Sequence, residues 1–129
     1  MLENFVYNPK VLRRLSKHYK TGDSLPDDYI SGIRKSRLLV PGLRYSRQIF
    51  MSLFDLMIHD GSLFEMVDEG WEMKKDVNLA KMWADLQKQV TGIDAIEETV
   101  PHCSFYHLYM GGYDSVYWCY LWAEVFCRI

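Results

Sequence analysis

Residues Leu43 to His59 read LRYSRQIFMSLFDLMIH, the stretch in which hydrophobic spacing is clearest. Its core-facing positions recur at steps of three and four, which places them on one side of a helix. They are Leu43, Ser46, Phe50, Leu53, Phe54, Met57 and Ile58. The spacing therefore predicts a core helix, and Asp60-Gly61 ends it because glycine accepts the left-handed conformation of a helix C-terminus.

Two further helices are predicted on the N-terminal side of this stretch. Asn8 can cap a helix that has Pro9 at its first position, and apolar residues then recur until Gly22. A second helix is expected to begin at Pro26 and to end before Pro41. Acidic residues in its first turn suit the positive end of the helix dipole.

The C-terminal side is predicted to contain two helices separated by a long loop. Residues 62–76 are charged and irregular, whereas residues 79–90 again show helical spacing, closed by Gly92. Residues 93–110 have weak periodicity and are expected to form a long loop, a feature that is often functional. Residues 113–129 are apolar nearly all round, which is typical of a buried helix. The expected fold class is all-α.

Composition is that of an ordinary soluble domain. The 129 residues are 49% hydrophobic and 25% charged, and their net charge of -2 gives no strong field for phosphates or anionic lipids. We therefore expect neither nucleic acid nor a membrane as a partner. Three cysteines without paired zinc spacing indicate buried thiols in a reducing compartment such as the cytosol.

A row of phenols follows a histidine and a glycine pair near the C-terminal end. His107 and Gly111-Gly112 come first, and glycine permits backbone conformations that are closed to other residues. Phenol hydroxyls can donate to a developing oxyanion, and an imidazole can orient a peptide carbonyl. If residues 113–129 are helical, one stripe contains Tyr113, Tyr117, Tyr120 and Glu124.

A purely structural interpretation of this row stays open. Tyrosines at helical spacing more often pack with their hydroxyls toward solvent or a carbonyl. No H-E-x-x-H occurs, and no other histidine has a partner at metal-ligand spacing. A metal-free enzyme that uses His107 with Asp114 or Glu124 lacks a nucleophile or a paired base.

Three runs resemble motifs of the thimet oligopeptidase and neurolysin family of zinc metallopeptidases. MLENFVY at residues 1–7 is similar to the family's MLENWVW, and LSKHYKTG at residues 15–22 is similar to LSRHYxTG. The most specific run is HLYMGGYDSVYWCYLWAEVF at residues 107–126, which resembles HLxGGYDAxYYxYLWSEVF. These landmarks extend through the whole chain in the family's order.

This resemblance implies the helical portion of a zincin-like oligopeptidase catalytic domain. The family's enzymes are zinc endopeptidases that cleave short peptides in a deep channel, and their zinc ligands lie upstream of MLEN. Residues 1–129 are therefore expected to be a partial catalytic domain, truncated at both ends. Alone it would hold no metal and be inactive, with the missing remainder of the peptidase as its partner. A cytoplasmic location is expected, with the mitochondrion as the second candidate.

The resemblance also assigns roles to residues of this chain. Tyr113 and Tyr120 are implied to be catalytic, because they would stabilise the tetrahedral intermediate. His107, Tyr117, Gly111 and Gly112 are implied to contact the substrate. An alternative from a different class is a non-catalytic helical interaction module derived from the same scaffold.

Three positions need separate comment. Glu3 is a candidate contact to a metal ligand, although a surface ion pair is the more ordinary role for such a residue. Tyr106 stands where the family usually has glycine, and Ser115-Val116 replaces an Ala-Gly-like pair. These departures are expected to stiffen the loop and to alter substrate range more than fold.

Overall fold

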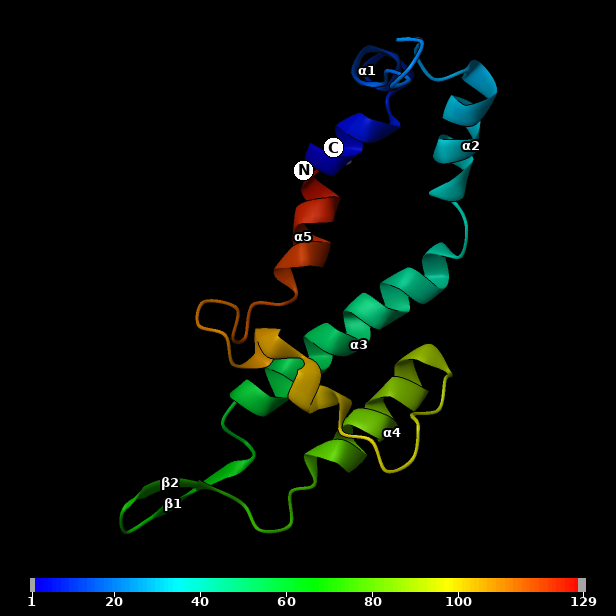
Figure 1. Ribbon diagram of the computed structural model, residues 1–129. Coiled ribbons are helices and arrows are strands. Elements are labelled where there is room, and N and C mark those ends of the chain that lie inside the picture. Colours follow the sequence, from blue (N-terminus) through cyan, green and yellow to red (C-terminus); the bar gives the residue numbers. More distant parts are fainter. Residues whose placement is uncertain (1, 128–129) are drawn as a thin grey trace. The chain divides into compact units, whose positions relative to one another are not determined.

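The computed structural model describes residues 2–127, and the side chains of residues 4–127. The chain divides into two compact units, Gly42–Trp122 and Met1–Pro41 with Ala123–Ile129. In chain order (Figure 1), the elements are η1 Leu2–Tyr7, α1 Pro9–Leu15, α2 Asp27–Ser36, α3 Pro41–His59, β1 Phe64–Val67, β2 Gly70–Met73, α4 Leu79–Thr91, η2 Pro101–Ser104, η3 Tyr106–Leu108 and α5 Cys119–Phe126. The predicted mostly helical fold is confirmed, and each unit is described by itself below.

The helices with clear periodicity and caps form where the sequence predicts them. The Asn8 side chain accepts a hydrogen bond from the backbone N–H of Lys10 at 2.9 Å, which caps α1. Helix α3 spans the predicted core stretch, but the predicted core face is only partly right. Leu43, Leu53 and Met57 are exposed, whereas Met51, Ser52 and Asp55 are buried beside Phe50 and Phe54. Helix α4 ends at Gly92, whose φ of 73° is the left-handed value expected at a C-terminal cap.

One prediction on the N-terminal side is corrected. Helix α1 ends at Leu15, so the predicted continuation toward Gly22 is wrong. Ser16 is extended, and its side-chain oxygen accepts from the backbone N–H of Leu25 at 3.0 Å. This local bond offers the backbone an alternative to another helical turn.

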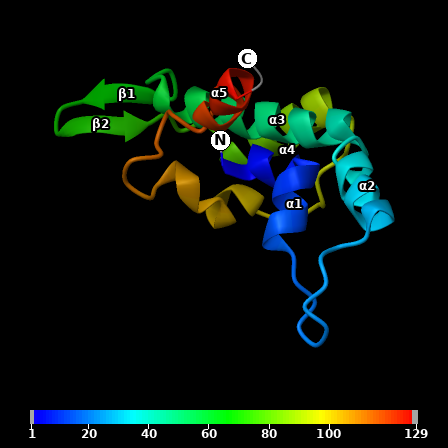
Figure 2. The ribbon, with the colours of Figure 1, turned by 90° about the horizontal axis from the view of Figure 1, so that it is seen from above.

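The irregular stretch 62–76 contains an antiparallel hairpin. Strands β1 and β2 extend away from the helices of the same unit (Figures 1 and 2). Side chains alternate between the two faces of a strand, so Glu65 and Glu72 share one face and the large apolar side chains of Phe64, Met66, Trp71 and Met73 share the other. The paired residues are Phe64 with Met73, Glu65 with Glu72, Met66 with Trp71, and Val67 with Gly70.

The last helix is shorter and more exposed than predicted. Helix α5 begins at Cys119, and residues 113–118 form turns instead of helix. Ser115 lies within these turns with φ of 64°, a left-handed value that interrupts a right-handed helix. The side chains of Val125 and Phe126 are more than half exposed, so burial of this helix is not what the structure shows.

The core of the Gly42–Trp122 unit is mostly aromatic. The ring of Trp83 on α4 meets Phe50 and Phe54 of α3 edge to face, at centroid distances of 4.6 and 4.9 Å. Phe105 reaches the other side of the indole at 6.0 Å. Edge-to-face pairs add stabilisation beyond burial alone. The complete buried cluster is Phe50, Met51, Phe54, Trp83, Phe105, Leu108 and Tyr117.

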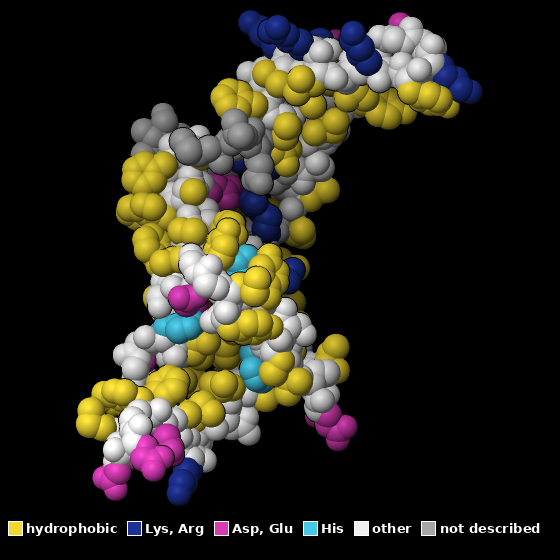
Figure 3. Space-filling model, turned by 60° about the vertical axis from the view of Figure 1, so that its left-hand side comes forward, with side chains coloured by type: hydrophobic (Ala, Val, Ile, Leu, Met, Phe, Trp, Pro, Cys, Tyr) yellow, Lys and Arg dark blue, Asp and Glu magenta, His cyan; other side chains and the backbone are white. Residues whose placement is uncertain are grey.

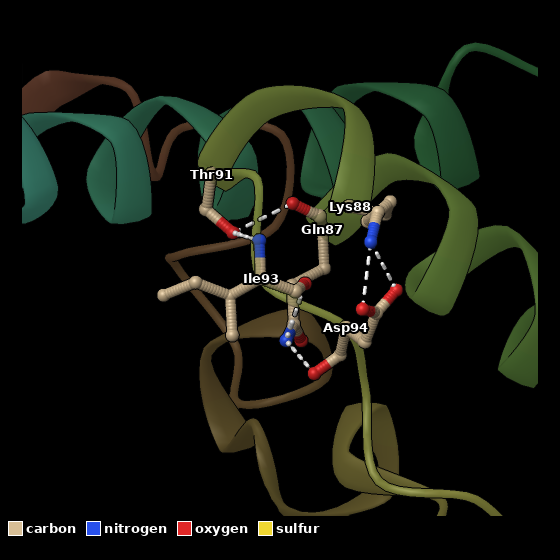
Figure 4. A network of polar contacts seen from close by, with 5 residues as sticks. All are labelled: Gln87, Lys88, Thr91, Ile93 and Asp94. Carbon is tan, nitrogen blue, oxygen red and sulfur yellow. Dashed lines mark hydrogen bonds and ion pairs between the residues drawn. The ribbon is translucent and has the colours of Figure 1, made fainter.

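A polar network fixes the point where α4 turns into the following loop (Figure 4). The Gln87 amide nitrogen donates to the carbonyl oxygens of Ile93 and Asp94, each at 3.3 Å. Lys88 and Asp94 form an ion pair at 2.6 Å, and Thr91 donates to the carbonyl of Gln87. The loop therefore leaves α4 in a defined direction and returns over the aromatic core.

In the other unit, Arg37 joins three segments. Its guanidinium donates to the Asn4 side-chain oxygen at 2.7 Å and lies 4.6 Å from the ring centroid of Tyr7. It also lies 3.8 Å from a carboxylate oxygen of Glu124. Residues near both ends of the chain are thus held to the C-terminal end of α2. Within the described residues, each helix is too short or too polar to cross a bilayer.

The aromatic core predicts a large effect for truncation at Phe54, which is 1% exposed. Phe54→Ala should lower the free energy of unfolding of this unit by about 3–5 kcal/mol, because it leaves a cavity beside Trp83. Urea denaturation followed by tryptophan fluorescence measures the change. Ile96→Ala, at a side chain 78% exposed, is the control and should stay within about 0.5 kcal/mol.

Candidate functional site

His107 is the centre of an aromatic cluster in the Gly42–Trp122 unit. Its ring stacks on Tyr106 with centroids 4.1 Å apart and an interplanar angle of 30°. Tyr113 and Tyr117 meet it edge to face, each at 5.2 Å. The hydroxyl of Tyr120 lies 3.3 Å from His107 Nε2. The structure thus brings together the histidine and the three tyrosines singled out from the sequence, although two of those tyrosines precede the helix.

Packing, more than hydrogen bonding, sets the orientation of this imidazole. The Nδ1 atom of His107 is buried and has no hydrogen-bond partner among the described residues. The ring is held instead by aromatic neighbours on several sides, including Phe105 at 5.4 Å. Its Nε2 atom consequently faces the Tyr120 hydroxyl. Figure 3 shows histidine side chains set among hydrophobic ones on one face of the molecule.

The three tyrosines occupy two different environments. Tyr113 and Tyr120 are 43% and 44% exposed, so both can meet a ligand. Tyr117 is 6% exposed, and its hydroxyl lies 3.7 Å from the sulfur of Met51. Tyr117 therefore packs inside the unit with its ring against His107, while Tyr113 and Tyr120 form the outer part of the cluster.

The pKa is raised for two of the phenols, Tyr117 and Tyr120. Burial raises the pKa of Tyr117 above its ordinary 10.0, while a hydrogen bond to Gln48 and the charge of Arg47 act in the opposite direction. Burial also raises the pKa of Tyr120, and the neighbouring Tyr113 phenol adds to that effect. A phenol that resists ionisation remains a hydrogen-bond donor over the neutral pH range.

A buried carboxylate on α3 holds the turns that carry these tyrosines. Asp55 has no exposed surface, and its two oxygens accept from the backbone N–H groups of Ser115 at 3.1 Å and Tyr117 at 3.0 Å. His59 Nδ1 lies 3.0 Å from the same carboxylate. Sequence analysis missed Asp55, although an acidic residue directly after Phe54 in a core helix was a visible signal.

The two loop glycines differ in backbone conformation. A Cβ added at Gly111 or Gly112 would meet nothing within 4 Å, so close packing does not require glycine at either position. Gly112 has φ of 97°, which L-residues rarely adopt. Tyr106, found in place of the family's glycine, is 53% exposed and covers one face of the His107 ring.

A pocket of about 520 Å³ adjoins the cluster. Its lining residues come from α3, α4 and the loop after α4, and Phe105 is the residue shared with the His107 cluster. They are Leu43, Arg47, Phe50, Met51, Trp83, Gln87, Thr91, Ile93, Pro101, Ser104 and Phe105. Most of these side chains are apolar, and Arg47 provides a positive charge.

No group of three potential metal ligands comes together within the part of the chain that the structure describes. The side chain of Glu3, a candidate contact to a metal ligand, lies outside the described side chains. Cys103 is an exposed free thiol, and Cys119 and Cys127 are partly exposed ones, so the prediction of buried cysteines is wrong. The described residues therefore do not form a zinc site.

The raised pKa values predict how stability responds to alkaline pH. The unfolded phenol of Tyr117 ionises near 10.0 and the folded one above it, so the unfolded state loses its proton first. The contribution of Tyr117 to the free energy of unfolding should be fully present below the unfolded pKa. It should be lost as the pH rises from the unfolded pKa through the folded pKa. Urea unfolding at a series of pH values should show a shallower alkaline loss in Tyr117→Phe. Parallel curves for the two proteins would contradict the assignment.

Comparison with known proteins gives the same family along the whole chain. The model of peptidase family M3 matches residues 1–128. Saccharolysin of Saccharomyces cerevisiae is 33% identical, over 98% of this chain and 16% of the relative. Organellar oligopeptidase A of Arabidopsis thaliana is 32% identical over 96% of this chain, and oligopeptidase A of Escherichia coli is 28% identical over 96%. The chain spans 14% and 17% of those two relatives. It belongs to peptidase family M3.

Proposed function

We propose that this chain contributes the substrate-contacting wall of a zinc metalloendopeptidase that hydrolyses short peptides. In this proposal, residues 1–129 are part of the catalytic domain and are inactive in isolation. Membership of peptidase family M3 supports peptide hydrolysis as the chemistry. The names of the relatives, oligopeptidase A and thimet-like oligopeptidase, support short peptides as the substrate class.

The single observation that carries the proposal is the contact between Tyr120 and His107. The hydroxyl lies 3.3 Å from Nε2 and the side chain is 44% exposed, so a donor is held in place without being enclosed. A carbonyl under attack develops negative charge on its oxygen, and a preorganised O–H donor stabilises that charge more than it stabilises the ground state. Tyr113, on another edge of the same imidazole, can supply a second donor.

The remaining cluster residues would position the peptide. His107 is fixed by packing, and its Nε2 meets the Tyr120 hydroxyl as donor or acceptor, depending on its tautomer. With the proton on Nε2, the hydroxyl accepts from the imidazole and keeps its own hydrogen for the peptide. The left-handed backbone of Gly112 lets the loop turn sharply between His107 and Tyr113. Gly111, beside it, adds conformational freedom at the same turn. Tyr117 would act through its ring, which supports the imidazole from inside.

Zinc enters this proposal only as part of the longer protein. The described residues do not bring three potential ligands together, so they do not fit a metal site of their own. The resemblance places the ligands upstream of residue 1. Within the chain, the protein's contribution is to bind and orient the peptide and to donate hydrogen bonds to its carbonyl.

Cytosol is the proposed compartment, with mitochondria second. One relative is named a probable cytosolic oligopeptidase A, and others are named organellar or mitochondrial. Three free cysteines are in keeping with a reducing compartment.

The principal test is the loss of one hydroxyl in the longer peptidase that carries this chain. Tyr120→Phe should lower kcat by about a hundredfold, because one oxyanion donor is worth on the order of 3 kcal/mol. Tyr113→Phe should act in the same direction. Tyr109→Phe is the matched control, since its hydroxyl donates to the carbonyl of Cys103 and should leave kcat within about twofold. Unaltered cleavage in both Tyr113→Phe and Tyr120→Phe would remove the catalytic assignment.

Metal removal separates a peptidase from an interaction module. Dialysis of the same longer protein against a chelator should abolish cleavage of a fluorogenic peptide, and one equivalent of zinc should restore it. Absence of both zinc binding and cleavage would favour the non-catalytic module. Cleavage by the 129-residue chain with chelator present would favour a metal-free enzyme.

A further inference from the structure

We propose that Asp55 is a positioning residue that holds the tyrosine-bearing turns in register with His107. The contact between Asp55 and these turns stands on geometry alone. Its consequence for catalysis rests on the proposed function, because that function makes the placement of Tyr113 and Tyr120 matter.

The carboxylate of Asp55 is fully enclosed and accepts from neighbours that are all N–H groups. Oδ1 receives the backbone N–H of Ser115 at 3.1 Å, and Oδ2 receives that of Tyr117 at 3.0 Å. An ionised carboxylate accepts hydrogen bonds and donates none, so this set matches its chemistry. The two oxygens of one side chain therefore accept hydrogen bonds from backbone positions two residues apart.

His59 holds the carboxylate in this orientation from the next turn of α3. Its Nδ1 lies 3.0 Å from Asp55 Oδ1 and 2.8 Å from the Asp55 carbonyl oxygen. The His59 side chain is 26% exposed, so it closes the site at its solvent side. Charge-assisted hydrogen bonds of this kind are stronger than neutral ones and compensate for the burial of the charge.

The backbone that donates to Asp55 is strained at Ser115. Ser115 has φ of 64°, where a residue with a Cβ is disfavoured, and its N–H is one of the two that Asp55 accepts. The chain turns between the two N–H groups that donate to Asp55. The Tyr117 ring then packs in the core, with its centroid 5.2 Å from that of His107. Tyr120 follows one turn later, with its hydroxyl at Nε2. A shift of this anchor would move the hydroxyls that face the ligand.

A residue that only stabilised the core would behave differently. Ser52 is also buried on α3, but its hydroxyl donates to the Gln48 carbonyl within the same helix. Ser52→Ala therefore removes a buried polar group of α3 whose hydrogen bond lies within the helix and not with the turns. It is the matched control for a loss of general stability.

The test compares Asp55→Asn with Ser52→Ala in the longer peptidase. Asparagine replaces one acceptor oxygen by an amide NH2 group, which leaves the N–H of Ser115 or Tyr117 facing a donor. Hydrogen exchange, measured by mass spectrometry on the segment 113–118, should become at least about tenfold faster in Asp55→Asn. Exchange across α4 should stay unchanged, and kcat should fall by about ten- to a hundredfold with KM within about threefold.

His59→Ala keeps the test decisive if Asp55→Asn does not fold. This variant keeps the Asp55 carboxylate and its two hydrogen bonds to the backbone, but it removes the imidazole that orients the carboxylate. Hydrogen exchange at 113–118 should then become about threefold faster, and kcat should fall about threefold. Wild-type rates of exchange at 113–118 in every variant that folds would overturn the anchor.

The outcomes separate the inference from the function on which it rests. Faster exchange with unchanged kcat, while Tyr120→Phe still lowers kcat, would overturn the positioning role and leave the proposed function intact. If Tyr120→Phe has no effect, the proposed function fails, and the exchange rates alone still decide the anchor. Equal acceleration at 113–118 and α4 would show general destabilisation and would overturn the inference.

Discussion

The Asp55 carboxylate imposes the constraint on which the arrangement around His107 depends. A charge without exposed surface needs donors in place of the water it loses, and here they come from the turns that precede α5 and from His59. Those turns cannot move away from α3 without leaving a buried charge unpaired. The carboxylate thus converts a flexible glycine-containing loop into a fixed support for aromatic side chains.

Packing around the imidazole gives the three tyrosines two different environments. Tyr117 contributes its ring to the core and turns its hydroxyl toward Met51, whereas Tyr113 and Tyr120 keep theirs at the outer edge. The same residue type is therefore enclosed at one position and accessible at two others.

The neighbouring pocket and the His107 cluster share Phe105. Its ring contacts His107 and Tyr117 on one side and lines the pocket on the other. The loop that carries it is tied to α4 by Gln87, which also accepts from the Trp83 indole at 3.2 Å. Core packing and loop direction are therefore coupled through a few side chains.

The sequence by itself determined the elements whose causes are local. Periodic apolar residues specified α3 and α4, while Asn8 and Gly92 set helix ends, because spacing and capping act within a few residues. Motifs such as the run from His107 also identified the family. Only the tertiary structure placed Tyr113 and Tyr117 outside a helix and turned the Tyr117 hydroxyl inward. The physical reason is distance along the chain: Asp55 acts on a backbone N–H 60 residues away, which no local pattern encodes.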